Sequence, residues 1–490
     1  MKYKLFLKNS VIYSISNVIL RFTAFLLIPI YVNYLSSEEY GLLSTILITI
    51  EFLAITMKLG MREAQIRFFE EFQEKTQIGT LLTSSTFVSI LGGFFFSAIC
   101  LFILPSFFQK IFHVDQADQF IMLACLAAFF QMLFEHFTAF FRAKNDALSF
   151  IITNIVAAVL IVSANGIIFL WFHYDVTSPL IAHVLAHGVV FLIVSVNLFI
   201  RYGIRISKKL TFRLLRFGLP LIFSAAGQRI FYPTAAYMLS FYSGLTDVAI
   251  FALGTKFASI LGMVLILPFQ MAFQPFLFIN LHNDGIQVAV SKFLTYFIYT
   301  IVLLSITVII GTKVILPFIA PPEYFDAISV VILSLPATGF LSLVIFGEAL
   351  VNITYKTHAT GMIIGFSGLL GVMLNYLLIP IWGWYGAIIS LNISAIFTGI
   401  TMLYYGIICY PIRLEWKQIT FSICTLVLFI VSSFLFRSEN ILMFCLIMFA
   451  GFAFVVFSLH FFSLFDKREK DHFRNIYFSI HQRLNREKII

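Results

Sequence analysis

Two arginines, Arg21 and Arg229, lie near the middle of apolar stretches that are long enough to cross a lipid bilayer. A charged side chain at that depth costs about 2.5–3.5 kcal/mol even on lenient insertion scales, so it needs a partner or a water-filled cavity. The two positions are equivalent in a duplicated sequence, because Arg21 precedes Gly41 by the same 20 residues by which Arg229 precedes Ala249. Cations at matched positions indicate that the protein binds something anionic inside the membrane.

The first half of the sequence leaves two interpretations of Arg21 open. Arg21 forms an ion pair with Glu51 in the next apolar stretch, or it faces a substrate together with Asn17, four residues earlier on the same helix face. Lys58 shares a helix face with Glu51 and offers that carboxylate a second partner. We therefore assign Glu51 and Lys58 as ion-pair or coupling residues and Asn17 as a candidate binding residue.

The second half is more informative, because its cations have no acidic neighbour in sequence. Arg229 and Lys256 lie at comparable depth in successive stretches, and Ser259 stands at the position equivalent to Glu51. Either a distant helix supplies a carboxylate, or the two cations line a water-filled, electropositive cavity in which an anionic substrate supplies the missing charge. The predicted cationic cavity therefore consists of Arg21, Arg229 and Lys256, with Asn17.

Three further titratable groups lie within apolar stretches near their predicted cytoplasmic ends. Glu135 and His136 are adjacent in the first half, and Glu348 stands in the second half at the position that corresponds to His136. Such groups are candidates for proton or sodium coupling. The alternative is structural pairing within the helix, as Glu348 can form with Lys356.

No cofactor or metal site is predicted. His183 and His187 have i, i+4 spacing but no third ligand, so we expect packing histidines. Gly361 and Gly365 have the small-xxx-small spacing of close helix packing, continued by Gly368. The chain has no GxxxxGK[ST], GxGxxG, HExxH or CxxC motif, which removes the usual signatures of ATPases, dinucleotide enzymes and zinc proteases. All five cysteines lie in apolar stretches: Cys100, Cys125, Cys409, Cys424 and Cys445.

The elements that must position these residues are membrane-spanning helices. The 490-residue chain is 60% hydrophobic and only 11% charged, whereas a globular domain carries about 25% charged residues. A helical span needs about 20 mainly apolar residues. Fourteen stretches meet this length: 10–34, 40–60, 79–104, 119–141, 148–172, 177–200, 217–241, 248–278, 293–317, 327–351, 359–380, 385–409, 418–436 and 440–464.

The distribution of basic residues predicts the orientation and the domains. Most of the 32 lysines and arginines fall in cytoplasmic segments if both termini are cytoplasmic. The net charge of +9 then reflects topology and gives no reason to expect nucleic-acid binding. Six spans fill each repeat, which predicts two pseudo-symmetric lobes in an all-α membrane protein. The predicted units are residues 1–205, 206–416, 417–465 with two extra spans, and a basic amphipathic tail at 466–490 that lies on membrane lipids.

Several motifs in order are similar to one family of transporters. Leu35–Gly41 resembles the LGxxEYG turn between the first two helices of Wzx-type polysaccharide or O-antigen flippases. Asn375–Pro380 with Gly383, Gly386 and Ala387 resembles their LNxxLIPxxGxxGA signature, and Leu59–Phe69 is also similar. The resemblance covers almost the whole chain. It departs from the family pattern at Ser36 and Ala249, where glycine is usual. The first span also lacks the acidic residue that many drug-exporting relatives use for cation coupling, which weighs against a drug antiporter.

The resemblance implies a MATE-like fold of the multidrug/oligosaccharidyl-lipid/polysaccharide exporter superfamily. It implies that the protein flips undecaprenyl-diphosphate-linked oligosaccharide from the inner to the outer leaflet of the bacterial plasma membrane by alternating access. The products of such flippases enter O-antigen, capsule or exopolysaccharide synthesis. The partners implied are the lipid-linked oligosaccharide, a polysaccharide polymerase and a chain-length regulator, with no cofactor.

Two rival functions make different demands on the sequence. A cation-coupled multidrug exporter of the same fold needs an acid within the membrane, for which Glu51 or Glu348 is available. A membrane polysaccharide polymerase or ligase needs a sizeable outer loop with catalytic residues, and all predicted outer connections are short. The sequence therefore favours transport over catalysis.

Overall fold

The structure is a computed structural model that describes the backbone of residues 2–72, 74–112, 116–171, 175–281, 285–354 and 356–435. Within these ranges the side chains of residues 2–12 are not described, nor are those of Ser14, Asn17, Arg21, Leu170, Phe223, Ser224, Gln228, Pro275, Thr357, Ser432, Phe434 and Leu435. The chain forms two compact units. One comprises Met1–Gln287 with Gly311–Ile412, and the other comprises Val288–Ile310 with the chain from Arg413 onward.

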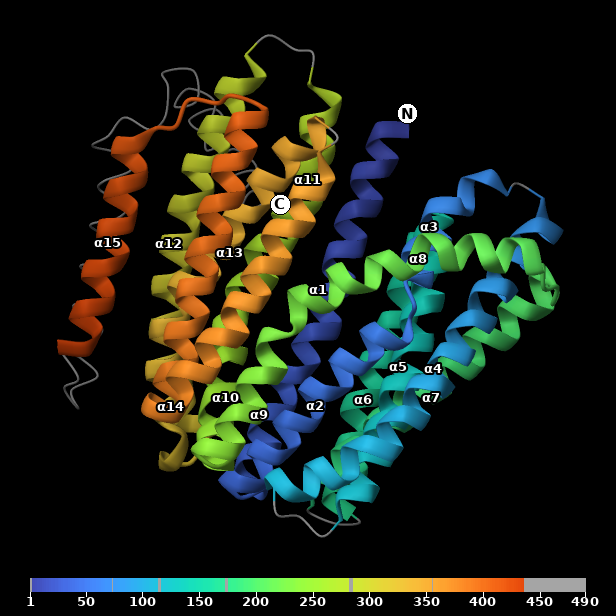
Figure 1. Cartoon of the computed structure of the whole chain (residues 1–490), viewed down its shortest axis with the longest axis horizontal. Helices are drawn as coiled ribbons and strands as arrows, with labels where there is room; N and C mark the ends of the chain where they lie inside the picture. The colour runs from blue at the N-terminus through green and yellow to red at the C-terminus, as the bar shows by residue number, and fades with distance from the viewer. Residues whose placement is uncertain are drawn as a thin grey trace, which may run out of the picture. The chain divides into compact units, whose positions relative to one another are not determined.

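The described residues fold into helices without any strand (Figure 1). The first half of the chain contributes α1 (Lys2–Tyr34), α2 (Ser37–Met57), α3 (Met61–Phe68), α4 (Lys75–Phe112), α5 (Ala117–Ala143), α6 (Ala147–Trp171) and α7 (Thr177–Tyr202). The second half contributes α8 (Lys208–Arg229), α9 (Phe231–Tyr242), α10 (Leu245–Leu261), α11 (Leu267–Ile279), α12 (Ile286–Ile319), α13 (Ala327–Ile353), α14 (Thr357–Cys409) and α15 (Trp416–Leu435).

The helices confirm the predicted fold class. In the described part of the chain, ten helical segments are long and apolar enough to cross a membrane, and two shorter apolar helices, Val18–Tyr34 and Trp416–Val431, accompany them. Thirteen of the fourteen predicted spans coincide with helix. The fourteenth span, 440–464, and the tail at 466–490 lie outside the described residues. The division into lobes at residue 205 stays a prediction.

Two predicted spans contain internal irregularities, and the predicted boundary between two others falls at a kink within one continuous helix assignment. The span at 217–241 is divided into α8 and α9 at Ile230. The span at 248–278 contains a π-helical turn at Gly262–Ile266, in the turn before Pro268, where the missing proline N–H disturbs the regular bonding. The spans at 359–380 and 385–409 are joined in α14 across Gly383, whose φ of 55° and ψ of −134° reverse the chain.

The start of α2 explains one departure from the family motif. Ser36 is the N-cap residue: its hydroxyl accepts the Glu39 backbone N–H at 3.3 Å, and the Glu39 carboxylate accepts the Ser36 N–H at 2.8 Å. This reciprocal pair is a capping box, which satisfies donors that a helix end otherwise leaves unpaired. Serine therefore supplies at this turn a side-chain cap that glycine cannot form.

The cap gives a quantitative prediction. Replacing Ser36 by alanine should lower the free energy of unfolding by about 1 kcal/mol, whereas glycine at the same position should cost only a few tenths. Thermal unfolding of the purified protein in one detergent, with both variants side by side, measures the difference. Equal losses from alanine and glycine would contradict the capping role.

The first unit is held together by helices that pack across the two halves of the sequence. α2 packs against α5 of its own half and against α10 of the second half, and α10 packs in turn against α13. α8 runs alongside α3 and α4 before it turns into α9 (Figure 1). At that contact a Cβ on Gly60 would lie 2.3 Å from the Gly218 carbonyl oxygen, so both glycines are required by close backbone approach.

The same contact carries an ion pair outside the predicted membrane region. Arg213 on α8 donates two hydrogen bonds to the Glu71 carboxylate, at 2.7 and 3.0 Å, and its guanidinium lies 4.4 Å from the centre of the Phe68 ring. Both charged side chains are largely exposed. An exposed pair of this kind contributes about 0–1 kcal/mol, so the pair positions α8 more than it stabilises the protein.

In the second unit, a hydrogen bond joins the start of α12 to the chain before α15. The hydroxyl of Ser291, near the start of α12, donates a hydrogen bond to the backbone carbonyl of Arg413, just before α15. This bond ties the chain that enters α15 to the first turns of α12.

Candidate functional site

The structure brings Arg229 and Glu51 together across the two halves of the sequence. Arg229 Nη1 lies 3.5 Å from Glu51 Oε2. Their side chains are 50% and 65% exposed, although α2 is otherwise among the more buried helices. The carboxylate that Arg229 lacks in its own and the following span therefore comes from a distant helix, which was one of the two sequence alternatives. Both charged groups are thus exposed at the surface of the described residues.

The position of Arg229 is set by the break between α8 and α9. Arg229 is the last residue of α8, where a cation interacts favourably with the helix dipole. The Thr234 hydroxyl donates to the backbone carbonyls of Ile230 and Phe231, at 2.9 and 2.8 Å, and so compensates for the irregular geometry. The helix end therefore holds the guanidinium at a fixed depth, at the point where the span changes direction.

Asn375 supports the break from the other side, and the sequence analysis did not assign it a role. Its side-chain amide is fully buried and lies 3.5 Å from the Phe231 carbonyl and 3.4 Å from the Thr234 hydroxyl. Asn375 is the asparagine of the LNxxLIP-like motif, which was the available signal. The predicted close packing of α14 occurs at Gly368, where a Cβ would lie 2.6 Å from the Gly227 carbonyl oxygen, whereas Gly361 faces open space.

Lys256 is held by an aromatic side chain and not by an acid. Its ammonium lies 3.4 Å from the Tyr40 hydroxyl and 5.3 Å from the centre of the Tyr40 ring. Tyr40 is completely buried and belongs to the LGxxEYG-like turn. Among the described side chains, no carboxylate lies within 4 Å of Lys256. The cation–π contact with the buried Tyr40 ring therefore fixes the position of this charge.

Lys58 and Glu135 form a second ion pair, within the first half of the chain. Lys58 is 7% exposed and pairs with Glu135 on α5, so the prediction that Lys58 competes for Glu51 is wrong. Arg62 Nη1 lies 3.8 Å from the same Glu135 oxygen, and the Gln131 amide donates to the other oxygen at 3.3 Å. His183 is 3.1 Å from Gln131, which extends the network to α7. In this network the buried Lys58 and the partly exposed Arg62 share the single carboxylate of Glu135.

The other candidate coupling residues are dispersed. His136 is 1% exposed and lies 3.2 Å from the Ser85 hydroxyl, so it packs between α4 and α5. Glu348 is half-buried on α13, which ends at Ile353, and it forms no ion pair with Lys356, which lies beyond the end of that helix. The backbone of Asn17 and Arg21 lies on α1, but their side chains are outside the described residues, so the Arg21–Glu51 pairing stays untested.

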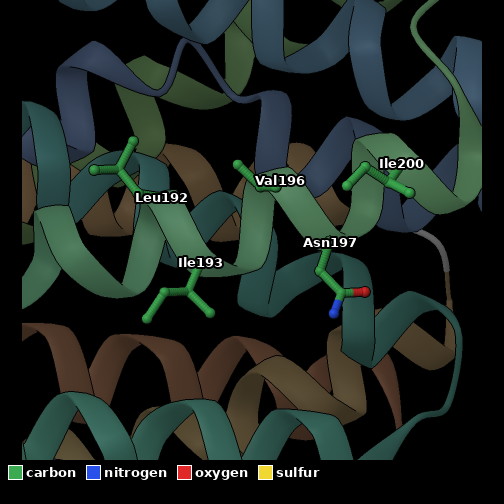
Figure 2. A pocket seen from close by; sticks show the side chains of 5 residues that line it. All are labelled: Leu192, Ile193, Val196, Asn197 and Ile200. Atoms are coloured by element: carbon green, nitrogen blue, oxygen red, sulfur yellow. The ribbon is translucent and has the colours of Figure 1, made fainter.

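A hollow of about 550 Å³ runs along α7 but offers no site (Figure 2). One helix alone lines it, with Leu192, Ile193, Val196 and Ile200 exposed and a single polar residue, Asn197. Apolar side chains exposed along one helix of a membrane protein are the expected surface toward lipid. This face therefore carries no candidate chemistry.

Comparison with a known family supports the membrane-transport interpretation. The sequence model of a family described as "Polysaccharide biosynthesis protein" matches residues 6–281, which is more than half of the chain. The match includes the described parts of α1 to α11 and therefore both members of the Arg229–Glu51 pair. No curated protein matches the sequence.

Solved structures show the same fold at low sequence identity. The lipid II flippase MurJ in an inward closed conformation has a TM-score of 0.73 and 13% identity, over 92% of this chain and 99% of that one. An inward-facing multidrug resistance MATE family transporter of the MOP superfamily has a TM-score of 0.64 and 16% identity, over 83% and 96%. An outward-facing MATE family transporter of the MOP superfamily has a TM-score of 0.59 and 17% identity, over 86% and 97%.

Proposed function

The chain belongs to the polysaccharide biosynthesis protein family, and from this membership together with the exposed Arg229–Glu51 pair we propose that it flips lipid-linked oligosaccharides across the membrane. The substrate proposed is an undecaprenyl-diphosphate-linked oligosaccharide, and the membrane is the bacterial plasma membrane with both chain termini in the cytoplasm. The product would be used for O-antigen, capsule or exopolysaccharide synthesis, with a polysaccharide polymerase and a chain-length regulator as partners.

The observation that carries the proposal is the exposure of two charges in the middle of membrane-spanning helices. A charged side chain does not face lipid at that depth, so side chains that are 50% and 65% exposed indicate a water-filled space between the two halves. The pair is weak because it is solvated and long, at 3.5 Å. A phosphate can replace Glu51 as the partner of Arg229, since guanidinium and phosphate form short bidentate hydrogen bonds.

In the proposed mechanism the diphosphate enters from the cytoplasmic side and meets Arg229, with Lys256 and Arg21 as further cations. Glu51 neutralises Arg229 while the site is empty and is displaced by the substrate. Rocking of the two lobes then exposes the sugar on the outer side while the lipid chain stays in the bilayer. No covalent bond changes, so the protein acts by recognition and translocation.

The proposal predicts a selective effect of Arg229. In a strain that lacks the gene, Arg229→Ala should reduce surface polysaccharide by about 10–100-fold at matched protein level, because a charge-assisted hydrogen bond contributes about 1.5–3 kcal/mol. Arg229→Lys should be intermediate, since lysine keeps the charge but not the bidentate geometry. Arg213→Ala is the matched control, because Arg213 also forms an exposed pair with a glutamate, outside the membrane.

A second pair of variants separates this function from drug export. Glu51→Gln should retain or increase polysaccharide export, because it removes the carboxylate that competes with the substrate for Arg229. A cation-coupled drug exporter that uses Glu51 would instead lose activity on the same change and would confer drug resistance in the wild-type form. Full export by the double variant Arg21→Ala, Arg229→Ala would overturn the assignment of the cationic site.

A further inference from the structure

A dense group of cations, which we call the basic surface, lies at residues 201–216, where α7 ends and α8 begins. This stretch contains six basic residues and no acidic one. All six are exposed: Arg201, Arg205, Lys208, Lys209, Arg213 and Arg216. Arg213 pairs with Glu71, but among the described side chains no carboxylate lies within 4 Å of the other five cations. The basic surface therefore carries positive charge that the described part of the protein does not neutralise.

The start of α8 is amphipathic, and its exposed face combines cations with an aromatic ring. Leu210 and Leu214 are buried in a core cluster with residues of α3 and α4. On the opposite face Phe212 is 70% exposed. Lys208 and Arg216 lie four residues before and after Phe212, so they flank its ring on the same face of the helix. Cations around an exposed aromatic side chain are the pattern of a helix that lies in the surface of a membrane.

The depth of the basic surface follows from the exposed apolar side chains on either side of it. In α7 these side chains continue to Ile200, which is 82% exposed (Figure 2). In α8 they begin again at Leu219, which is 44% exposed. Ile200 ends one predicted span and Leu219 lies at the start of the next, so the six cations between them lie at the level of the lipid headgroups. Ile204 and Ile206, at 69% and 52% exposure, add apolar contact area within the basic surface.

The backbone that carries these cations is held on α4. The Ser207 N–H donates to the Ser84 hydroxyl of α4 at 3.2 Å, and the Ser207 hydroxyl accepts the Leu210 N–H at 3.4 Å as the N-cap of α8. A Cβ on Gly79 would lie 2.2 Å from the Tyr202 carbonyl oxygen, so α4 and the end of α7 are in close backbone contact. Because this backbone is fixed before a ligand binds, the entropic cost of binding is reduced.

We propose that the basic surface binds the headgroups of anionic phospholipids in the leaflet where α8 begins. Its uncompensated charge selects an anion, and its exposed Phe212 and Ile204 side chains select an anion that is attached to a hydrocarbon phase. Headgroup binding here is independent of the cargo, because it needs neither Arg229 nor Glu51. It would hold the start of α8 at the membrane surface, while the other end of the same helix carries Arg229.

The proposed partner is tested by photo-cross-linking of the full-length protein in phosphatidylcholine nanodiscs that contain a trace of one photoreactive lipid. Two probes carry the same acyl chains with a diazirine beside the glycerol, and they differ only in having a phosphatidylglycerol or a phosphatidylcholine headgroup. The anionic probe should label residues 201–216 about tenfold more than the zwitterionic probe. Raising the salt concentration from about 0.05 to about 0.5 M should reduce this excess, because the interaction is between exposed charges.

Matched charge variants assign the excess to the basic surface. Lys208→Gln combined with Lys209→Gln should reduce the excess to about twofold without changing the labelling by the zwitterionic probe. Arg67→Gln combined with Lys75→Gln also removes two exposed cations, but three glutamates lie between them in the sequence, so the excess should persist. All four positions are exposed, and both double variants should elute as the wild type does in size-exclusion chromatography. An unchanged excess in the first variant, or an equal loss in the second, would overturn the proposal.

Two further outcomes separate the basic surface from other binding sites. Arg229→Ala should leave the labelling of residues 201–216 unchanged, and loss of the anionic excess in that variant would show that the lipid binds through the candidate site instead. Equal labelling by the two probes in the wild-type protein at low salt would exclude anionic lipid and leave an acidic protein as the partner of the basic surface. Neither outcome depends on polysaccharide export, so the flippase assignment is tested separately.

Discussion

Glu135→Ala should destabilise the protein by about 3–5 kcal/mol, because it leaves the ammonium of Lys58 buried without its partner. Lys58 is 7% exposed and lies at the end of α2, where Glu135 supplies the carboxylate. Arg62 contacts the same oxygen but is one-third exposed, so it can turn toward solvent, which Lys58 cannot do without moving α2. The loss should appear as a large decrease in the melting temperature of the purified protein in detergent.

Two controls make this expectation specific to the pair. Glu348→Ala removes a half-buried glutamate of the second half that forms no ion pair with any described residue, so its effect should be much smaller. Lys58→Met combined with Glu135→Met should recover most of the loss, because a buried pair replaced by apolar side chains of similar volume is often neutral. A double variant as unstable as Glu135→Ala would show that the network matters through some contact other than the ion pair.

Gly41→Ala should disrupt the contact between α2 and α10, with a cost of about 3 kcal/mol or more. A Cβ on Gly41 would lie 2.0 Å from the backbone carbonyl oxygen of Leu245, and backbone atoms cannot move aside as a flexible side chain can. The contact joins the two halves of the sequence at the end predicted to face outward. The substitution should therefore destabilise the state in which that end is closed.

The effect of Gly41→Ala can be measured by the accessibility of a nearby cysteine to labelling, as well as by protein stability. Thr45 lies one turn further along α2 and is completely buried, so a cysteine placed there in a cysteine-free background should be protected from a membrane-impermeant maleimide added from outside. Gly41→Ala should increase the rate of labelling. Gly166→Ala is the control, because nothing lies within 4 Å of a Cβ there and alanine is a better helix former than glycine. Unchanged labelling would contradict a closed outer contact at Gly41.

The sequence could predict the helices because membrane spans are determined by local composition. A run of about 20 apolar residues can satisfy its backbone hydrogen bonds only as a helix or in a closed barrel, so length and hydropathy locate the spans without tertiary information. The break at Ile230 is different. Pro233 favours it, because proline lacks the N–H that would bond the Arg229 carbonyl, but the support for the break is not local. Asn375 supports the break from α14, 144 residues away, and no local pattern reveals such support.

Part of the candidate site could also be predicted from local composition. The depth of Arg229 and Lys256 follows from their positions in the spans, but their partners depend on which helices become neighbours. Glu51 and Lys58 share a face of α2 in sequence, yet the first contacts α8 and the second contacts α5. Pairing over such separations is decided by helix packing, which the pattern of one span does not contain.

The break at Ile230 has a mechanical consequence for transport. Because Arg229 is the last residue before the break, a swing of α8 about this pivot against α9 rotates the guanidinium itself. Substrate binding by Arg229 and the motion of α8 would then occur at the same position in the chain. Binding and helix movement would be coupled directly, without intervening side chains.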